Sequence, residues 1–331
     1  MTGQSSVTAR LVQVTGAQPG SLNGGPDNPR HNGHRASKRR RRATALPYLL
    51  MTPALILLVG LAYPFGLGVY YSFTSYWLQY PNRFRFIWFD NYIGLLDEPL
   101  FSRALEFTLV FTLAAVVLQV GLGLAIALFL HGRIPGRGVI RAMMLMPLMI
   151  PPVITALMWK IMMASTTAGV LNYLLSFLGV DPVNWLGSTQ GAVASVLIID
   201  TWGNLPFIAL ILLGALQALP TEPYEAARVD GAGPLDILRY VTLPLLSPFV
   251  VLAVTFRTMD SLRVFDVIYA TTAGGPDDAT TNLQIMAYQF SFQWYQLGKG
   301  MTQALVLLLM VVLASFMLFR LWNRSAERTA Q

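Results

Sequence analysis

The sequence predicts an all-helical integral membrane protein with six transmembrane helices. The chain has 331 residues, of which 54% are hydrophobic and only 12% are charged. Soluble domains carry roughly 25% charged residues, so about half of the usual solvating charge is missing. The mean hydropathy is +0.53, and the sequence contains six long stretches that are almost free of charge. These observations argue against both a soluble enzyme and an intrinsically disordered chain.

The composition also excludes several kinds of site. The chain has no cysteine, which rules out a disulfide framework, a thiolate nucleophile and a cysteine-ligated metal. Its three histidines, His31, His34 and His131, are too scattered in the sequence to indicate a catalytic or metal centre. We therefore expect no catalytic residue, no metal and no cofactor.

The distribution of charge predicts a tail and a membrane domain. Residues 1–44 hold eight basic side chains and one acidic one, whereas the rest of the chain is electrically balanced. We expect a disordered basic cytoplasmic tail over residues 1–44, a transmembrane domain over 45–322 and a cytoplasmic C-terminal tail over 323–331. The basic run Lys38–Arg42 is of a kind that can bind nucleic acid. It directly precedes an apolar segment, which favours a topogenic membrane anchor and no nucleic-acid partner.

Each predicted span is long enough to cross a bilayer, which takes about 20 apolar residues for about 30 Å of hydrocarbon. The first, Leu46–Phe73, is longer than the core of a signal peptide and has no small-residue cleavage site, so we interpret it as retained. The other spans are Phe107–Leu130, Ala142–Met163, Gly191–Ala218, Leu245–Ala270 and Met301–Phe319. The third of the six contains Pro147, Pro151 and Pro152, which predict a kink or a break.

The placement of basic residues predicts the orientation of the spans, because cytoplasmic loops are enriched in Lys and Arg. If the basic tail is cytoplasmic, sixteen of the 23 basic residues lie in the tail, the two inner loops and the C-terminal segment. Only four lie in the three outer loops. The sequence therefore predicts that both termini are cytoplasmic.

The loop after the fourth span, residues 220–244, has the pattern of a short helix, a break and a second short helix. Pro223 suits a first helical turn, and Glu222 and Glu225 favour the positive end of a helix. Gly231 and Gly233 indicate the break, after which Pro234 restarts the chain. On composition alone, this loop could be an ordinary amphipathic connector.

The spacing of the loop resembles a known motif. Glu225-Ala226-Ala227, Asp230-Gly231 and Leu243-Pro244 occur at the spacing of the EAA loop of ATP-binding-cassette importer permeases. This resemblance implies the six-helix type I importer fold. It also implies that the loop is a coupling helix that docks into a cytoplasmic ATPase. The residues that it assigns to coupling are Glu225, Ala226, Ala227, Asp230 and Gly231.

Further stretches resemble the permeases of carbohydrate importers of the maltose/glycerol-3-phosphate type, specifically the first of two unlike permeases. They are Pro53-Ala-Leu, Tyr63-Pro64, Ser72-Phe73, Phe89-Asp90-Asn91-Tyr92, Phe265-Asp266-Val-Ile-Tyr269 and Thr272-Ala-Gly274-Gly275-Pro276. The resemblance implies a second permease subunit, two ATPase subunits, an external binding protein, a sugar-type substrate and a bacterial or archaeal plasma membrane. No complete phosphate-binding P-loop is present, which indicates a transport subunit and not an ATPase.

The fifth span contains charged residues that could either contact the substrate or hold this helix to its neighbours. Arg257, Asp260, Arg263 and Asp266 alternate in sign at a spacing of three, so neighbours can meet along one helix. Because ionisable groups inside a membrane are costly, we expect them to be paired or to face a wet cavity. These pairs could simply lock the helix to its neighbours. Alternatively, some of them face the substrate together with Ser261.

The resemblance to the maltose permease implies sugar contacts at Arg257, Asp260, Ser261 and Val264 in the fifth span, at Trp202, Gly203 and Phe207 in the fourth, and at Leu148. In the fourth span, Trp202 offers a flat face to a sugar ring and Asn204 offers a donor and an acceptor. A core-packing role for Trp202 and Phe207 remains open. The exact solute also remains open among a disaccharide, a polyol, an amino sugar and glycerol-3-phosphate.

The alternative function is a proton-coupled secondary transporter, which the acids Asp200, Asp260 and Asp266 within the spans could serve. No internal inverted repeat is evident, which weakens this alternative. An intramembrane hydrolase is a third class, but the sequence lacks a convincing Ser/His/Asp set.

Overall fold

The computed structural model describes the backbone of residues 33–132, 135–166 and 169–330, with side chains from residue 50 to 325 within those ranges. The described residues form helices and loops, with one isolated antiparallel bridge between Thr74 and Phe86. Five of these helices are long and apolar enough to cross a membrane, and one strongly bent pair brings the number to six if it counts as a single span. The predicted all-helical membrane class is confirmed for the described part of the chain.

The chain divides into two units, residues 1–62 and residues 63–331. The described part of the first unit belongs to α1 (Gly33–Ser72). Residues 33–44 of the predicted tail therefore lie in a helix, which agrees with the good helix propensity of the Ala, Lys and Arg residues there. Residues 1–32, the rest of the predicted tail, lie outside the described residues.

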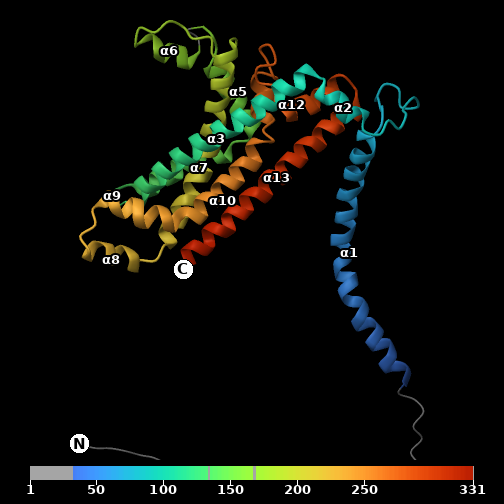
Figure 1. The fold of residues 1–331 in the computed structure, drawn as a ribbon, viewed down its shortest axis with the longest axis horizontal. Helices are drawn as coiled ribbons and strands as arrows, with labels where there is room; N and C mark the ends of the chain where they lie inside the picture. The colour runs from blue at the N-terminus through green and yellow to red at the C-terminus, as the bar shows by residue number, and fades with distance from the viewer. Residues whose placement is uncertain (1–32, 133–134, 167–168, 331) are drawn as a thin grey trace, which may run out of the picture. The chain divides into compact units, whose positions relative to one another are not determined.

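The second unit contains the end of α1 and all of the later elements (Figure 1). They are α2 (Asp90–Leu96), α3 (Pro99–His131), α4 (Arg137–Met149), α5 (Pro152–Met162), α6 (Val170–Ser176), α7 (Thr189–Ala218), α8 (Glu222–Val229), α9 (Pro234–Asp236), the π-helix η1 (Ile237–Thr242), α10 (Leu243–Ser261), α11 (Asp266–Thr271), α12 (Leu283–Tyr288), the π-helix η2 (Gln289–Gln293) and α13 (Leu297–Ala330).

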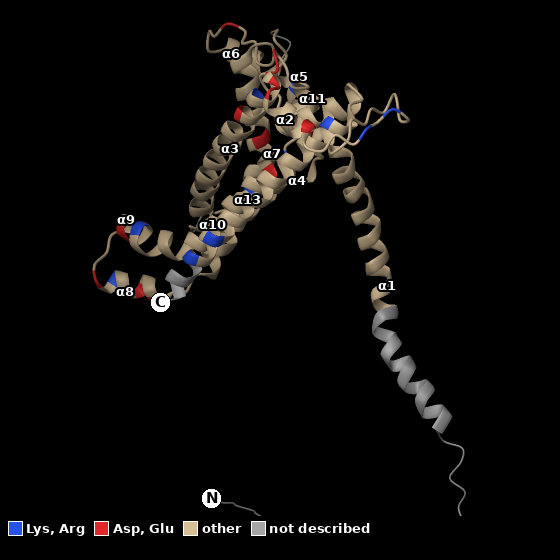
Figure 2. Ribbon diagram, turned by 45° about the vertical axis from the view of Figure 1, so that its right-hand side comes forward, with Lys and Arg blue, Asp and Glu red and all other residues tan. Residues whose placement is uncertain are grey.

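Four long helices, α3, α7, α10 and α13, run alongside one another and form the body of this unit (Figure 1). The short helices α8 and α9 lie at one end of them together with the end of α13, and α2, α6 and α11 lie at the other end (Figure 2). The predicted coupling loop and the predicted outer loops are thus at opposite ends of the helices.

Small residues bring α3 and α7 close together at one part of their interface. A Cβ atom added to Gly123 would lie only 2.8 Å from Cγ2 of Ile208, so the two backbones approach closely at this point. Ala127 on α3 and Ala209 on α7 are also buried. Inside a bilayer the hydrophobic effect does not drive helices together. Small residues of this kind instead allow the close van der Waals packing that holds them together. The close packing allows polar side chains of the two helices to reach one another.

The third span is broken, as its prolines predict. α4 and α5 are bent by 99° with respect to each other, and the break falls at Ile150 and Pro151. Pro151 and Pro152 follow each other there, and neither has a backbone N–H to continue the helix. Ile150 and Pro152 at the break line a small cavity beside α7.

The fifth span is predicted as one continuous helix over Leu245–Ala270, but in the structure it is broken into two helices. α10 ends at Ser261, and the chain continues through residues 262–265 before α11 begins at Asp266. Buried Leu262 packs in the core with α12 and α13, whereas Val267 and Ile268 pack with Phe111 and Met163. The two segments are separated because their apolar residues are buried in different clusters.

The second short helix of the coupling loop also differs from its prediction, because it is not a separate helix. It begins at Pro234 as expected, but it continues through η1 into α10 without a break. Pro244 has no N–H to donate to the carbonyl of Tyr240, and the π-helical turns immediately before it accommodate this gap. The part of the coupling loop from Pro234 onwards is therefore continuous with the helix that carries Arg257.

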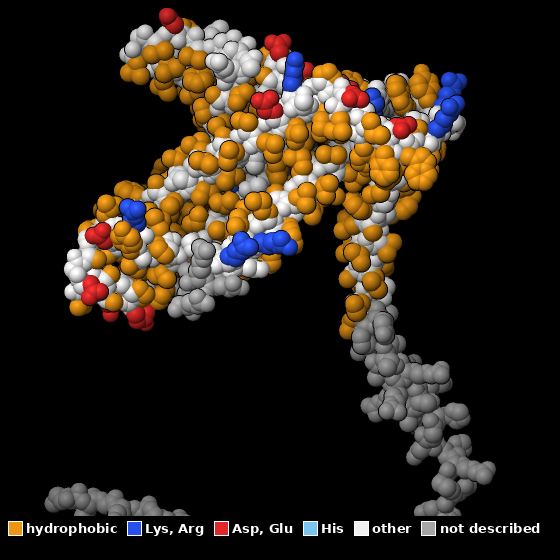
Figure 3. Space-filling view, in the orientation of Figure 1, with side chains coloured by type: hydrophobic (Ala, Val, Ile, Leu, Met, Phe, Trp, Pro, Cys, Tyr) orange, Lys and Arg blue, Asp and Glu red, His pale blue; other side chains and the backbone are white. Residues whose placement is uncertain are grey.

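Hydrophobic side chains cover the sides of the long helices, and charged side chains gather towards their ends (Figure 3). Leu109, Leu113 and Val117 on α3 are exposed, as are Leu309 and Leu313 on α13. A monomeric soluble protein rarely exposes so large a contiguous apolar surface. These faces are suited to lipid or to other membrane helices.

Candidate functional site

The first candidate site is the segment from α8 to α9, which the sequence assigns to coupling. α8 has acidic Glu222 and Glu225 in its first turn and basic Arg228 in its last, which complements the helix dipole. No residue of α8 is buried. An isolated helix of eight residues is unstable in water, so this arrangement requires stabilisation from the rest of the chain or from a partner.

The break after α8 depends on Gly231, as predicted. Gly231 has a φ of +82°, a left-handed conformation that costs other L-residues roughly 1–2 kcal/mol. No atom lies within 4 Å of a Cβ built at this position, so the constraint is conformational and not steric. The coupling residues Glu225, Ala226 and Asp230 are exposed and Ala227 is half-buried. The segment therefore presents the predicted coupling residues on an accessible surface.

A cavity of about 250 Å³ lies between α8 and the end of α7. Tyr224, Glu225 and Arg228 contribute from α8, and Leu216 and Gln217 contribute from α7. His131, at the end of α3, completes the wall on the remaining side. The cavity brings the coupling helix and the ends of two long helices together.

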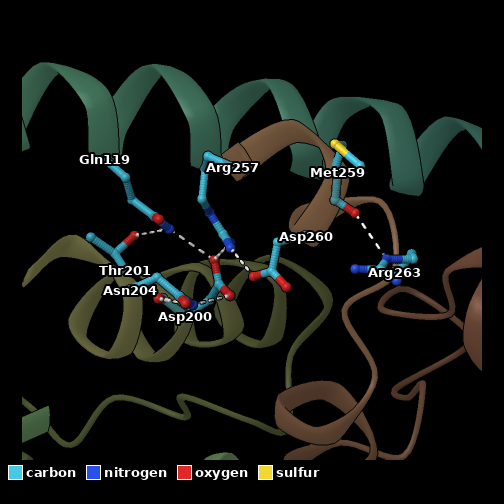
Figure 4. Close-up of polar contacts among 8 residues, drawn as sticks. All are labelled: Gln119, Asp200, Thr201, Asn204, Arg257, Met259, Asp260 and Arg263. Atoms are coloured by element: carbon cyan, nitrogen blue, oxygen red, sulfur yellow. Dashed lines mark hydrogen bonds and ion pairs between the residues drawn. The ribbon is translucent and has the colours of Figure 1, made fainter. Parts of the chain in front are cut away.

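The second candidate site is a charge cluster between α3, α7 and the last turns of α10 (Figure 4). The guanidinium of Arg257 on α10 forms ion pairs with Asp200 on α7 and with Asp260, one turn further along α10. The distance between Nη1 of Arg257 and Oδ2 of Asp260 is 2.6 Å. The side chains of Arg257 and Asp200 are each only 2% exposed, whereas that of Asp260 is 61% exposed. Arg257 thus links a fully buried acid to an acid at the surface of a cavity.

Two amides complete the surroundings of Asp200. Gln119 on α3 donates from Nε2 to Oδ2 of Asp200 at 2.8 Å and contacts the hydroxyl of Thr201 at 3.3 Å. Asn204 donates from Nδ2 to Oδ1 and to the backbone carbonyl of Asp200, at 3.1 and 3.0 Å. Both carboxylate oxygens of Asp200 are therefore satisfied within the protein.

Gln119 was not among the predicted site residues. The only signal was a single amide in the otherwise apolar second span, and nothing in its spacing pointed to Asp200, 81 residues away. The hydrogen bond from Gln119 to Asp200 depends on which faces of α3 and α7 pack together.

The predicted ladder of four charges on one helix is wrong beyond its first pair. Arg257 and Asp260 meet at a spacing of three, but Arg263 lies past the end of α10. Its Nε donates to the carbonyl of Met259 at 3.1 Å. Asp266 is exposed in the first turn of α11. The ladder does not form because the helix ends at Ser261.

A cavity of about 450 Å³ opens beside the exposed face of the cluster. It is lined by Asn204, Phe207, Ile208, Phe256, Arg257, Met259, Asp260 and Arg263. Phe207 and Phe256 meet edge to face, with ring centroids 6.4 Å apart. The cavity therefore combines an aromatic wall with several groups able to form hydrogen bonds.

A smaller cavity of about 160 Å³ lies on the other side of Asn204, beside the break between α4 and α5. Its lining includes Leu148, Asp200, Gly203 and Asn204. Asn204 thus separates two cavities, and Gly203 and Leu148 face the smaller one.

The remaining residues predicted for the substrate path lie elsewhere. Trp202 packs edge to face against Trp159, with centroids 6.0 Å apart, and lines neither cavity. Ser261 is buried. Val264 follows the end of α10, where its carbonyl accepts a hydrogen bond from Asn282. The structure therefore brings Asn204, Phe207, Arg257 and Asp260 together and leaves these three apart.

Comparison with known proteins defines the class. Residues 119–328 match the family described as "Binding-protein-dependent transport system inner membrane component". The chain is 39% identical to the trehalose/maltose transport system permease protein MalF of Thermococcus litoralis, over 85% of this chain and 94% of the relative. It is 32% identical to the trehalose transport system permease protein SugA of Mycobacterium tuberculosis, over 89% of this chain and 92% of the relative.

A solved structure shows the same fold. A chain of a bacterial alginate ABC transporter, crystallised with an alginate pentasaccharide-bound periplasmic protein, superposes with a TM-score of 0.72 at 23% identity. The match covers 86% of this chain and 97% of that one. The fold is that of an ABC transporter permease, and the chain belongs to the family of binding-protein-dependent transport system inner membrane components. It is an inner-membrane transport subunit and not an enzyme, because in this family a separate subunit hydrolyses ATP.

Proposed function

We propose that the chain is one of two unlike permease subunits of an ATP-driven importer that carries a sugar delivered by an external binding protein. Two ATPase subunits bind on the cytoplasmic side, and α8 is the helix that docks into one of them. The single observation that carries this proposal is the segment from α8 to Gly231, an exposed short helix held between two membrane-spanning helices. The names of the two relatives support a sugar as the substrate.

The proposed orientation places both termini and α8 in the cytoplasm. The excess of Lys and Arg in the predicted inner segments supports this orientation. α8, α9 and the end of α13 lie at the same end of the long helices, so a single orientation accounts for all three (Figure 2). Closure of the ATPase dimer would then move α8 and, through η1, the helix α10.

The proposed substrate path passes the 450 Å³ cavity beside Asn204, Phe207 and Asp260. Phe207 and Phe256 offer apolar faces to the C–H groups of a sugar ring, and Asn204 and Asp260 offer acceptors to its hydroxyls. Gly203 and Leu148 line the smaller cavity beside this path. Trp202, Ser261 and Val264 remain predicted path residues, which would come into contact with substrate only in another state of the transport cycle.

The test is sugar uptake by the complete importer in proteoliposomes, with ATP inside and the binding protein outside. Wild-type uptake should require ATP and should persist when a proton ionophore is added. Glu225→Lys should abolish uptake, because it reverses an exposed charge on α8 while leaving the spans intact. The matched control is Asp97→Lys, the same charge reversal at an exposed site on the loop between α2 and α3.

Uptake by Glu225→Lys at the wild-type rate would overturn the coupling role of α8. Uptake that needs no ATPase subunit and stops with the ionophore would instead establish the proton-coupled transporter.

A further inference from the structure

The segment between α1 and α2, residues 74–89, is rich in both aromatic and basic side chains, and we call it the aromatic loop. Seven of the 14 residues 76–89 are aromatic. Arg83 and Arg85 are the only charged residues of the loop, and no acidic residue lies among residues 28–89. Most of its large apolar side chains are exposed, namely those of Trp77, Leu78, Tyr80, Phe84, Phe86, Trp88 and Phe89. The loop therefore presents an extensive apolar surface with a net positive charge.

The conformation of the aromatic loop is fixed by the elements around it. Thr74 and Phe86 form the antiparallel bridge. The buried side chain of Asn91 donates from Nδ2 to the carbonyls of Ser72 and Thr74, at 2.8 and 2.9 Å. Gly298, in the first turn of α13, leaves no room for a side chain beside the carbonyl of Thr74, so the two backbones are in close contact. Because the surface is preorganised, little conformational entropy is lost when a ligand binds to it.

The rings and the charges of the loop lie side by side. Phe86 packs against Tyr70 in the last turns of α1, with ring centroids 6.3 Å apart. Cζ of Arg83 lies 5.8 Å from the ring centroid of Tyr80. Arg83 and Arg85 are exposed, and neither belongs to an ion pair within the part of the chain that the structure describes. In the space-filling view, basic side chains at the right-hand edge lie next to large hydrophobic ones (Figure 3). Both guanidinium groups are thus available to an anion beside an apolar surface.

The aromatic loop begins where a membrane-spanning helix ends. The span Leu50–Ser72 has 23 residues, which cover about 34 Å and so cross about 30 Å of hydrocarbon. This length places the loop at the level of the lipid headgroups, where Trp and Tyr are enriched in membrane proteins. The helix that follows the loop, α2, lies at the end of the long helices opposite to α8 (Figure 2). In the proposed orientation, that end faces the outer leaflet.

We propose that the aromatic loop binds anionic phospholipids of this leaflet, with its rings against the acyl chains and with Arg83 and Arg85 on the headgroup phosphates. A guanidinium group can donate two parallel hydrogen bonds to one phosphate. The net negative charge of an anionic headgroup complements the two arginines, whereas a zwitterionic headgroup has none to offer. A soluble protein that binds and leaves would repeatedly expose these apolar side chains to water, whereas lipid covers them permanently. The lipid contact is independent of the solute that the importer carries.

The test uses a fluorophore at the exposed position 82, next to Arg83. Because the chain contains no cysteine, Asn82→Cys supplies one thiol for labelling with bimane in an importer assembled with cysteine-free partner subunits. The importer is placed in phosphatidylcholine nanodiscs that contain a varied fraction of either brominated phosphatidylglycerol or brominated phosphatidylcholine. Both lipids should quench the bimane. Half-maximal quenching should need an at least about fivefold lower fraction of the phosphatidylglycerol, because even one Arg near an anionic lipid surface favours binding by about that factor.

The double change Arg83→Gln with Arg85→Gln should abolish this preference, while quenching by both lipids persists because the rings remain. The matched control is Arg103→Gln, the same change at an exposed arginine in the first turns of α3 and outside the aromatic loop. It should alter the preference less than about twofold, because its charge is screened at that distance.

Absence of quenching by either lipid would overturn the proposal, and a change of bimane emission on addition of the external binding protein would then assign the surface to that protein. Equal quenching by the two lipids would also overturn it, as would a preference that survives the double arginine change. The measurement needs neither ATP nor a sugar. Failure of the proposed function would therefore appear as absent uptake and would leave the quenching unchanged.

Discussion

The coupling segment and the buried charge cluster are built in opposite ways. Residues 222–233 lie together in sequence, are largely exposed, and owe their conformation to local signals such as Pro223 and Gly231. The cluster joins Gln119, Asp200 and Arg257 from three helices, far apart in sequence and buried. A local motif can be recognised by spacing alone, whereas a site assembled by helix packing becomes visible only in three dimensions.

The same difference predicts how the two regions respond to change. The cluster contains charges that depend on one another inside the protein, so its disruption should affect folding. The coupling segment has little internal packing, so its disruption should affect transport and leave the fold intact. Variants in the two regions should therefore differ in their effects on stability and on transport.

The largest effect is expected for Arg257→Met. This change leaves the buried carboxylate of Asp200 without its counter-ion, which typically costs about 3–5 kcal/mol of folding free energy. We expect a marked fall in the thermal midpoint of the purified importer and in the yield of folded protein. The measurement is heat-induced loss of the monodisperse peak in size-exclusion chromatography.

The control for this variant is the double change Asp200→Leu with Arg257→Met, which removes both buried charges. It should recover most of the lost stability, because replacing a whole buried pair with apolar residues is often neutral. If the single variant were as stable as the wild type, the cluster would not be the buried, interdependent structure described above.

An intermediate effect is expected at Gly231, where the backbone requires a positive φ. Gly231→Ala should strain this turn by about 1–2 kcal/mol and displace α8, whereas Gly231→Asn should be tolerated better, because Asn adopts left-handed conformations more readily. We expect several-fold lower uptake for the Ala variant than for the Asn variant, with similar thermal midpoints, because the exposed turn can relax without disturbing the spans. Equal uptake by the two variants would show that the turn does not set the position of α8.

Much of the fold could be predicted from the sequence, because the apolar stretches and the prolines are local signals. Pro151 and Pro152 indicated the break in the third span, and Gly231 indicated the turn after α8. The end of α10 could not be predicted, because residues 262–265 contain neither glycine nor proline. Tertiary burial of Leu262 and Val267 in separate clusters determines that break.

The candidate site was predicted only in part for the same reason. Arg257 and Asp260 are neighbours on one helix, so their spacing was sufficient. The role of Asp200 as the second partner of Arg257 depends on the packing of α7 against α10, and that of Gln119 depends on the close approach of α3 and α7 at Gly123. No spacing rule within one segment contains that information.

The smallest effect concerns the element that connects the two regions. The π-helix η1 lies between α9 and α10, and Pro244 follows it. Pro244→Ala supplies an N–H that can bond to the carbonyl of Tyr240 and so favours ordinary α-helical turns. Tightening η1 would rotate the coupling segment relative to α10. We expect a change in stability of less than about 1 kcal/mol, because only one backbone hydrogen bond is gained.

The informative measurement is the amount of sugar imported per ATP hydrolysed, which should fall about twofold if η1 transmits the motion of α8 to α10. Pro248→Ala is the matched control, since it makes the same chemical change four residues further on, inside α10 and away from the π-helix. Should both variants import the same amount of sugar per ATP, the two regions would be coupled by some route other than η1, because only the first variant alters it.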